Sequence, residues 1–258
     1  MKKRLIYIFG NWKLHMTVGE TETFMQELCT TIPTTSCIVG IAPPFTSIAM
    51  AASRAKSGGK CSQIRIGAQN MSEHLRGAYT GEVSSAMIKE VGAQFVLLGH
   101  SERRMHFYEK SSTIHRKVLL ALQEGLMPLL CIGETQEEQE DGRTKKVLTS
   151  QLSEALRDIP REQMRKILIA YEPVWAIGTG KTATPKIVQE IHHFCRSLLV
   201  HSWGEEIAEA VPILYGGSVK PANIAQLIAQ PDVDGALIGG ASLEAKSFVQ
   251  IIKNSVLG

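Results

Sequence analysis

Eight short stretches in which almost every residue is apolar recur along the chain, and this repetition is the strongest constraint on its fold. Strands covered on both faces, as in a parallel sheet, need continuous apolar runs, whereas half-exposed strands alternate apolar and polar residues. The runs therefore predict eight buried parallel strands. They are Leu5–Phe9, Ile38–Ala42, Ile64–Ala68, Phe95–Leu98, Pro128–Ile132, Ile167–Tyr171, Pro212–Tyr215 and Ala236–Ile238.

Segments with helical spacing of apolar residues lie between these runs. Pro185 and Pro221 each begin such a segment, and we predict both in the first turn of a helix, where a missing backbone N–H removes no hydrogen bond. Strand-like and helix-like segments therefore alternate along the chain. The clearest helical segments are Glu20–Thr31, Ser112–Gln123, Thr144–Arg157, Pro185–Val200 and Pro221–Ala229.

Eight such βα units in 258 residues have the size and rhythm of a closed (β/α)8 barrel, in which helices surround eight parallel strands. An open doubly wound sheet is the alternative, but it usually carries GxGxxG after its first strand, where this chain has Gly10-Asn11-Trp12-Lys13. Because no low-complexity segment or Pro/Gly/Ser-rich linker interrupts the pattern, we predict one barrel domain over residues 1–258.

The composition excludes several classes of protein. Apolar residues make up 44% and charged residues 21%, as in a soluble globular protein, and the net charge of +3 predicts no nucleic-acid partner. No apolar stretch approaches the roughly 20 residues of a membrane span, and Leu5–Phe9 is too short for a secretory signal. The five cysteines are odd in number and form no CxxC pair, which favours reduced thiols in a cytoplasm over a disulfide framework or a zinc site.

Unusual residues cluster directly after the predicted strands, and in such a barrel the loops at the carboxyl ends of the strands carry the functional site. The clusters follow the first, fourth, sixth, seventh and eighth strands. They are Asn11-Trp12-Lys13, Gly99-His100-Ser101-Glu102, Tyr171-Glu172-Pro173, Gly216-Gly217-Ser218 and Gly239-Gly240.

Glu172 ends an apolar strand, so we expect its carboxylate to be buried at the barrel mouth, with a pKa raised enough to make it a stronger base than in water. An isolated glutamate here is more often a surface residue. The following proline-anchored, glycine-containing segment is typical of a lid, which favours the catalytic interpretation. Its Gly178-Thr179-Gly180-Lys181-Thr182 is not a P-loop, because Trp175 stands where the first glycine should be.

His100 precedes a predicted helix, whose dipole disfavours added positive charge, so we expect a neutral ring that donates a hydrogen bond. Lys13 and Asn11 supply a cation and an amide at the mouth, and Glu102 either begins the helix or holds Lys13 or His100. Neither Glu102 nor Glu172 has a metal-ligand neighbour at helical spacing, so no metal site is predicted.

Glycine pairs in consecutive βα loops indicate an anion site, because a backbone without Cβ atoms can approach a phosphate closely. We expect Ser218 and the N–H groups of Gly239 and Gly240 to converge on a phosphate, with the N–H of Gly178 reaching it from the lid.

Six blocks, in one order over the whole chain, resemble the signature blocks of the triosephosphate isomerase family. The block around Glu172 is the most specific, and the minor departure Leu14-His15 after Lys13 touches no proposed site residue. The blocks are Gly10–Lys13, Leu98–Arg104, Cys131–Thr135, Ala170–Gly180, Tyr215–Val219 and Ile238–Leu243.

The resemblance implies a TIM barrel that interconverts dihydroxyacetone phosphate and D-glyceraldehyde 3-phosphate through an enediolate, in glycolysis and gluconeogenesis, without cofactor or metal. It further implies that Glu172 moves the proton between two carbons, and that neutral His100 polarises the carbonyl and shuttles protons between the oxygens. Lys13 would stabilise negative charge on the substrate and enediolate, and Asn11 would help to place it. Gly178, Ser218, Gly239 and Gly240 would bind the phosphate.

Members of this family are typically homodimers. The segment 69–84 resembles the loop that inserts into the partner subunit, with Thr80 near its tip. Its length, unusual within a compact domain, gives that expectation local support.

Two other functions fit the sequence less well. A phosphate-binding barrel such as an aldolase would need a Schiff-base lysine inside a strand, but Lys166 precedes the sixth strand and Lys181 lies in the lid. A non-catalytic protein on the same scaffold would be expected to lack Lys13, His100 or Glu172, and all three are present.

Overall fold

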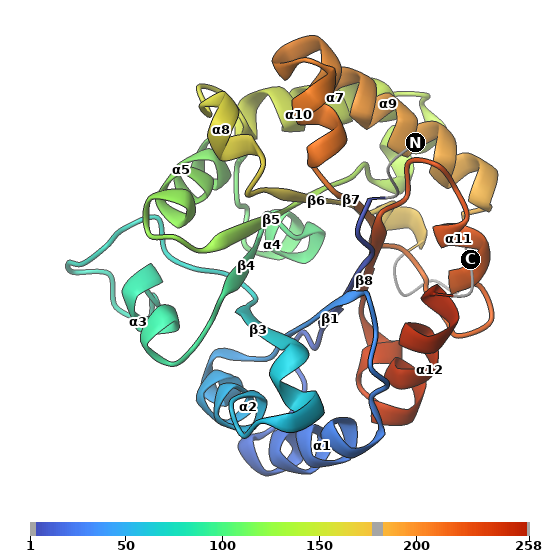
Figure 1. Cartoon of the computed structure of the whole chain (residues 1–258). Helices are drawn as coiled ribbons and strands as arrows, with labels where there is room; N and C mark the ends of the chain where they lie inside the picture. Colours follow the sequence, from blue (N-terminus) through green and yellow to red (C-terminus); the bar gives the residue numbers. More distant parts are fainter. Residues whose placement is uncertain (1–3, 177–182, 257–258) are drawn as a thin grey trace.

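The computed structural model describes residues 4–176 and 183–256, and its eight strands form one closed parallel barrel in which β8 pairs with β1 (Figure 1). The predicted fold class is therefore confirmed. The strands are β1 (Tyr7–Asn11), β2 (Ile38–Ala42), β3 (Ile64–Ala68), β4 (Phe95–Leu98), β5 (Met127–Ile132), β6 (Leu168–Tyr171), β7 (Ile213–Tyr215) and β8 (Gly235–Ile238).

All eight predicted runs are strands, and β2, β3 and β4 begin and end where the apolar runs do. The reason is burial on both faces. Ten residues from the strands fill the barrel interior, with Phe9 and Phe95 in contact at a ring-centroid distance of 4.6 Å. A larger apolar layer lies between the barrel and the helices.

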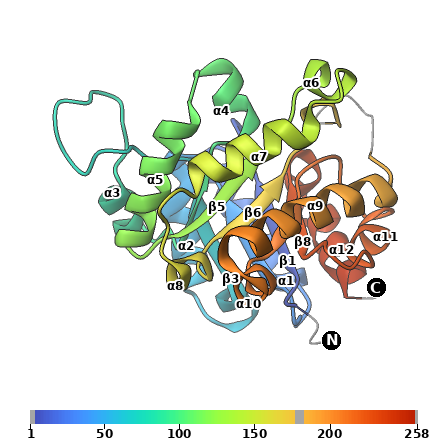
Figure 2. The ribbon, with the colours of Figure 1, turned by 90° about the horizontal axis from the view of Figure 1, so that it is seen from above.

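The helices surround the barrel, as Figures 1 and 2 show. The α-helices are α1 (Val18–Thr31), α2 (Ile48–Ala55), α3 (Ser85–Glu90), α4 (Ser101–His106), α5 (Ser111–Gln123), α6 (Gln136–Glu140), α7 (Thr144–Ala155), α8 (Arg161–Met164), α9 (Pro185–Trp203), α10 (Glu205–Ala210), α11 (Ile224–Ile228) and α12 (Ala245–Ser255). Short 3-10 turns are η1 (Phe45–Ser47), η2 (Gly59–Gln63), η3 (Val174–Ala176) and η4 (Gly240–Ser242).

Of the two prolines predicted in first turns, one is confirmed. Pro185 begins α9, and the side chain of Thr184 caps that helix by accepting the N–H of Ile187. The prediction for Pro221 is wrong, because α11 begins only at Ile224. The side chain of Asn223 accepts the N–H of Lys220 and donates to the carbonyl of Ser218, so a side-chain turn occupies the residues that the pattern assigned to the helix.

The expectation that all five cysteines are reduced is also wrong. Cys29 in α1 and Cys61 in η2 form a disulfide with their Cα atoms 4.8 Å apart. These residues are 32 positions apart in sequence, and only the packing of α1 beside η2 brings them together. Cys37, Cys131 and Cys195 are free and buried.

The loop between β3 and α3 projects from the side of the barrel, at the left of Figures 1 and 2. Its base is closed by a hydrogen bond of 2.8 Å from the N–H of Ser72 to the carbonyl of Val83, and the ring of Tyr79 stacks on that of His74. Thr80 lies in its exposed outer part. Throughout residues 4–176 and 183–256, no helix is long and apolar enough to cross a membrane.

Candidate active site

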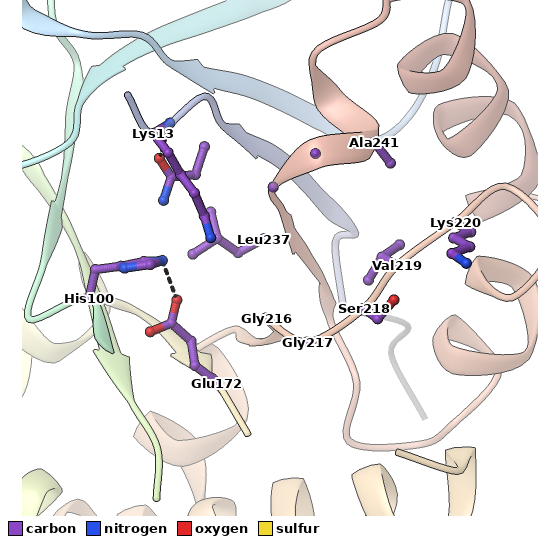
Figure 3. A pocket seen from close by; sticks show the side chains of 13 residues that line it. Lys13, His100, Glu172, Gly216, Gly217, Ser218, Val219, Lys220, Leu237 and Ala241 are labelled. Atoms are coloured by element: carbon purple, nitrogen blue, oxygen red, sulfur yellow. Dashed lines mark hydrogen bonds and ion pairs between the residues drawn. The ribbon is translucent and has the colours of Figure 1, made fainter. Parts of the chain in front are cut away.

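The carboxyl ends of the strands surround a cavity of about 250 Å³. Seven predicted site residues line it, and the side chains of Lys13, His100 and Glu172 point toward one another across it, with Ser218 on the opposite side (Figure 3). Gly178 lies outside the described residues. The lining residues are Asn11, Lys13, His100, Glu172, Gly216, Gly217, Ser218, Val219, Lys220, Leu237, Gly239, Gly240 and Ala241.

Glu172 follows β6 directly and is only 1% exposed. One carboxylate oxygen lies 2.9 Å from Nε2 of His100, and the other accepts the N–H of Ser101 at 2.9 Å. The chain packs closely around this residue, since a Cβ at Gly133 would lie 1.8 Å from the Glu172 carbonyl oxygen and one at Gly216 would lie 2.8 Å from its Cγ. Any side chain at either glycine would displace Glu172.

The prediction that burial raises the pKa of Glu172 is wrong for this arrangement. Burial does favour the protonated acid, but His100, the N–H of Ser101 and the charge of Lys13 together outweigh it and lower the pKa. The apolar strand before Glu172 indicated burial correctly, but it gave no sign of these partners. Two of them lie where α4 begins, His100 at its cap and Ser101 as its first residue.

His100 precedes α4, as predicted, and its side chain also caps that helix. Its Nδ1 accepts the N–H of Glu102 at 3.3 Å, so the ring proton belongs on Nε2, and this hydrogen bond fits the neutral ring. Burial alone would lower the pKa of His100, but the adjacent Glu172 carboxylate outweighs it and raises the pKa. Burial and the Glu172 carboxylate therefore act in opposite directions on the pKa of His100, and the carboxylate has the larger effect while the two side chains are in contact.

Lys13 extends its ammonium into the cavity from a backbone in the left-handed region, with φ of 52°. Its N–H donates to the side-chain oxygen of Asn11 at 3.0 Å, and its Nζ lies 2.6 Å from a carboxylate oxygen of Glu102. Glu102 also lies 3.6 Å from Nδ1 of His100. Glu102 therefore contacts Lys13 more closely than it contacts His100, so it mainly holds Lys13.

The loops after β7 and β8 meet at the same cavity. Ser218 lies in one, and Gly239 and Gly240 lie in the other, as the glycine pattern predicted. No heavy atom lies within 4 Å of where a Cβ at Gly240 would stand, so the backbone there faces open space. An anion can approach the backbone of Gly240 without obstruction.

Sequence reasoning missed two contributors to the site. The backbone N–H of Ser101 holds Glu172, and the side chain of Gln69 donates to the carbonyl of Lys13 at 2.8 Å. Gln69 directly follows the third apolar run, so its position at the carboxyl end of a strand was a usable signal. In the described part of the chain, no group of three or more His, Cys, Asp or Glu residues is arranged to hold a metal ion.

Comparison with known proteins gives consistent matches along nearly the whole chain. The triosephosphate isomerase family model matches residues 6–255. A triosephosphate isomerase of Carboxydothermus hydrogenoformans is 49% identical over 97% of this chain and 98% of its own length. Those of Protochlamydia amoebophila and Chlamydia muridarum are 47% and 46% identical, over 97% and 96% of this chain and 94% and 90% of their own lengths.

Proposed function

The chain belongs to the triosephosphate isomerase family and interconverts dihydroxyacetone phosphate and D-glyceraldehyde 3-phosphate, and from this premise we propose that Glu172, His100 and Lys13 carry out the reaction. Glu172 takes a proton from the carbon next to the substrate carbonyl, and an enediolate forms. The carboxylic acid then returns a proton to the neighbouring carbon, while Nε2 of His100 passes a proton from the hydroxyl oxygen to the former carbonyl oxygen. The net reaction moves one proton between the two carbons and one between their two oxygens.

The negative charge of the enediolate requires fixed donors and a nearby cation. In this proposal Nε2–H of His100 donates to the carbonyl oxygen as that charge develops, and the ammonium of Lys13 attracts the charge. The support is that both side chains face the same cavity. Asn11 contributes by holding the backbone of Lys13, and Glu102 by holding its ammonium.

Ser218 and the N–H groups of Gly239 and Gly240 bind the phosphate in this proposal, together with Gly178. The phosphate takes no part in the proton transfer. Its binding energy holds the reactive end of the substrate against Glu172 and His100, and this positioning lowers the barrier to the reaction.

Substrate binding must also separate Glu172 from His100. The single proton on Nε2 cannot serve Glu172 and the substrate carbonyl together. When Glu172 leaves His100 and Ser101, the partners that lower its pKa are lost and burial favours the protonated form, so the carboxylate becomes a stronger base. His100 in turn loses the charge that raises its pKa and favours the neutral state.

The convergence of Lys13, His100 and Glu172 on one cavity is the observation that carries this proposal. The test is isomerase activity of purified protein after treatment with a chelator, with formation of dihydroxyacetone phosphate coupled to its reduction. We expect fast turnover by the wild type and almost none by Glu172→Gln. Undiminished turnover in a folded Glu172→Gln protein would eliminate Glu172 as the base.

We further propose that the protein is a homodimer in which the loop 69–84 contacts the partner subunit. Support comes from the projection of this loop and from partly exposed apolar side chains on it, with Leu75 49% and Tyr79 45% exposed. Sedimentation equilibrium tests the dimer, and Tyr79→Asp should shift the population toward monomer. A monomer with full activity would contradict this proposal and leave the roles in the cavity untouched.

A cytoplasmic location is proposed from the enzymatic step and from the three free thiols. The Cys29–Cys61 pair must then exist in a reducing compartment, where disulfides are uncommon. Alkylation of the protein in intact cells, followed by mass measurement, would show whether this pair is reduced there. Cell fractionation would test the location independently.

We also propose that residues 1–258 form a single domain, because pairing of β1 with β8 joins the two ends of the chain in one barrel. A single unfolding transition, seen alike by fluorescence and circular dichroism, is expected. Two separated transitions would contradict it.

A further inference from the structure

The backbone of Lys13 adopts a conformation that non-glycine residues seldom adopt, and something must hold it there. Residues in such conformations persist only where their surroundings fix them. The N–H of Lys13 is held by the side chain of Asn11, as described above. Its carbonyl is held from another strand of the barrel.

That carbonyl accepts a hydrogen bond from Gln69, the residue that follows β3. The Gln69 amide nitrogen donates to the carbonyl oxygen of Lys13 at 2.8 Å and to that of Ala42, the last residue of β2, at 3.0 Å. An amide NH₂ group has two hydrogens, so both of its donors are used. One side chain thus joins the carboxyl ends of β2 and β3 to the loop after β1.

Gln69 is itself fixed by its neighbour in the chain. The side chain of Asn70 accepts a hydrogen bond of 2.9 Å from Nζ of Lys117, which is only 4% exposed and also pairs with Glu109. The start of the loop 69–84 is therefore anchored to α5, and the Gln69 amide is presented to Lys13 from a rigid base.

We propose that Gln69 is a positioning residue for the isomerase reaction, whose amide holds the Lys13 carbonyl and so directs the Lys13 ammonium into the cavity. This inference rests on the role proposed for Lys13. Gln69 is not among the described residues that line the cavity. Its effect passes through the backbone of Lys13, because a rotation of that backbone would turn the long side chain away from the enediolate.

The test replaces Gln69 by methionine, which has similar length but no donor. The matched control is Gln63→Met at the other end of β3, where the Gln63 amide donates to the carbonyl of Pro33 at 3.1 Å, far from the cavity. Both substitutions remove a side-chain donor beside the same strand. The measurements are kcat, KM, the inhibition constant of inorganic phosphate, and the midpoint of urea unfolding.

For Gln69→Met we expect kcat/KM to fall by roughly tenfold to a hundredfold, the range that a misplacement of up to about 1 Å produces. Inhibition by inorganic phosphate should weaken severalfold, because the ammonium contributes to the field in the cavity. Gln63→Met should keep all three kinetic constants. A loss of stability without a kinetic change in Gln69→Met would overturn the proposal.

A double-mutant cycle separates positioning from a general structural role. In a Lys13→Ala background, Gln69→Met should change kcat/KM by less than about twofold, because the ammonium that it positions is absent. An equal loss in both backgrounds would overturn the inference. If Lys13→Ala alone keeps full activity, the proposed role of Lys13 fails instead, which is a different result.

If Gln69→Met does not fold, Gln69→Glu takes its place, since it keeps the shape and replaces the donors by a carboxylate. At neutral pH that carboxylate faces two carbonyl oxygens and cannot donate to either, so the same kinetic loss is expected. Wild-type kinetics in a folded Gln69→Glu protein would overturn the proposal.

Discussion

Titratable side chains gather at both ends of the barrel, and the two groups differ in the partners that complete their interactions. At the carboxyl end, Lys13, His100 and Glu172 face a cavity. At the amino end, Arg196, Asp232 and Asp234 contact one another within the protein, and Arg196 is 4% and Asp234 2% exposed.

The cluster at the amino end is satisfied by the protein itself. Arg196 donates to the carboxylates of Asp232 at 2.7 Å and Asp234 at 2.6 Å. Its remaining N–H groups donate to the carbonyls of Ala208, Val211 and Asp232. Asp234 also accepts the N–H of Ile213 and pairs with Arg4. Every donor and acceptor therefore has its partner before any ligand arrives.

The difference between the two clusters separates a structural role from a functional one. A cluster whose partners are all internal holds strands together, whereas a cluster that faces a cavity has capacity left for a ligand. We therefore expect substitutions at the amino end to change the free energy of unfolding, and substitutions at the carboxyl end to change the rate of reaction.

Arg196→Met should show the difference between the two ends most clearly, because it should lower stability without changing the rate of reaction. Removing the guanidinium leaves two carboxylates buried with reduced compensation, and the free energy of unfolding should fall by about 3 to 5 kcal/mol. The kcat of the folded fraction should stay within about twofold. Urea unfolding gives the first quantity and active-site titration with an inhibitor gives the second.

The control for this change is Arg157→Met, which removes an exposed ion pair with Asp158. Exposed pairs contribute little, so its unfolding free energy should change by less than about 1 kcal/mol. A kcat that falls in parallel with stability in Arg196→Met would show that the two ends are not separable.

His192 allows a pH test of the cluster at the amino end of the barrel, because its Nδ1 lies 3.1 Å from the carbonyl oxygen of Asp232. Burial lowers the pKa of this histidine to about 4, from an ordinary value of 6.5. The unfolded chain thus binds the proton more tightly, so this contribution to stability is complete above pH 6.5 and is lost as the pH falls toward 4. The loss should reach about 3 kcal/mol at pH 4.

His192→Gln should lack this part of the pH dependence. The measurement is the difference in unfolding free energy between the two proteins at pH 7 and near pH 4, because other titrating groups cancel in the difference. A difference that stays constant with pH would mean that His192 does not titrate in this range.

Glu172→Asp should have the opposite effect to Arg196→Met, lowering the rate of reaction while leaving stability almost unchanged. Shortening the side chain by one methylene retracts the carboxylate by roughly 1 Å, so kcat should fall by about a hundredfold, or about 2.7 kcal/mol. The midpoint of urea unfolding should hardly move. Wild-type turnover with Asp at this position would contradict the assignment of the base.

Glu102→Gln should have the smallest effect. Its carboxylate pairs with Lys13 but is 40% exposed, so water and salt screen the interaction. We expect kcat/KM to fall by about fivefold, close to 1 kcal/mol, with a smaller difference at high ionic strength. A loss as large as that of Glu172→Asp would place Glu102 among the groups essential for the reaction.

Local sequence patterns predicted the strands and helices well. They predicted contacts between residues that are distant in the sequence much less well. The run Phe95–Leu98 is apolar because both of its faces are buried, so its bounds could be read directly, and the residues after several strands identified the cavity. The lowered pKa of Glu172 depends on groups about 70 residues earlier in the chain. The Cys29–Cys61 pair and the Gln69 amide likewise depend on packing that no spacing expresses.

The Cys29–Cys61 bond also closes β2, α2 and the exposed turn after α2 into a covalent ring. Lys56 and Lys60 in that turn are exposed to proteases such as trypsin. A chain cut at either lysine would still migrate as one piece on a denaturing gel, and would separate into two fragments only after a reducing agent is added.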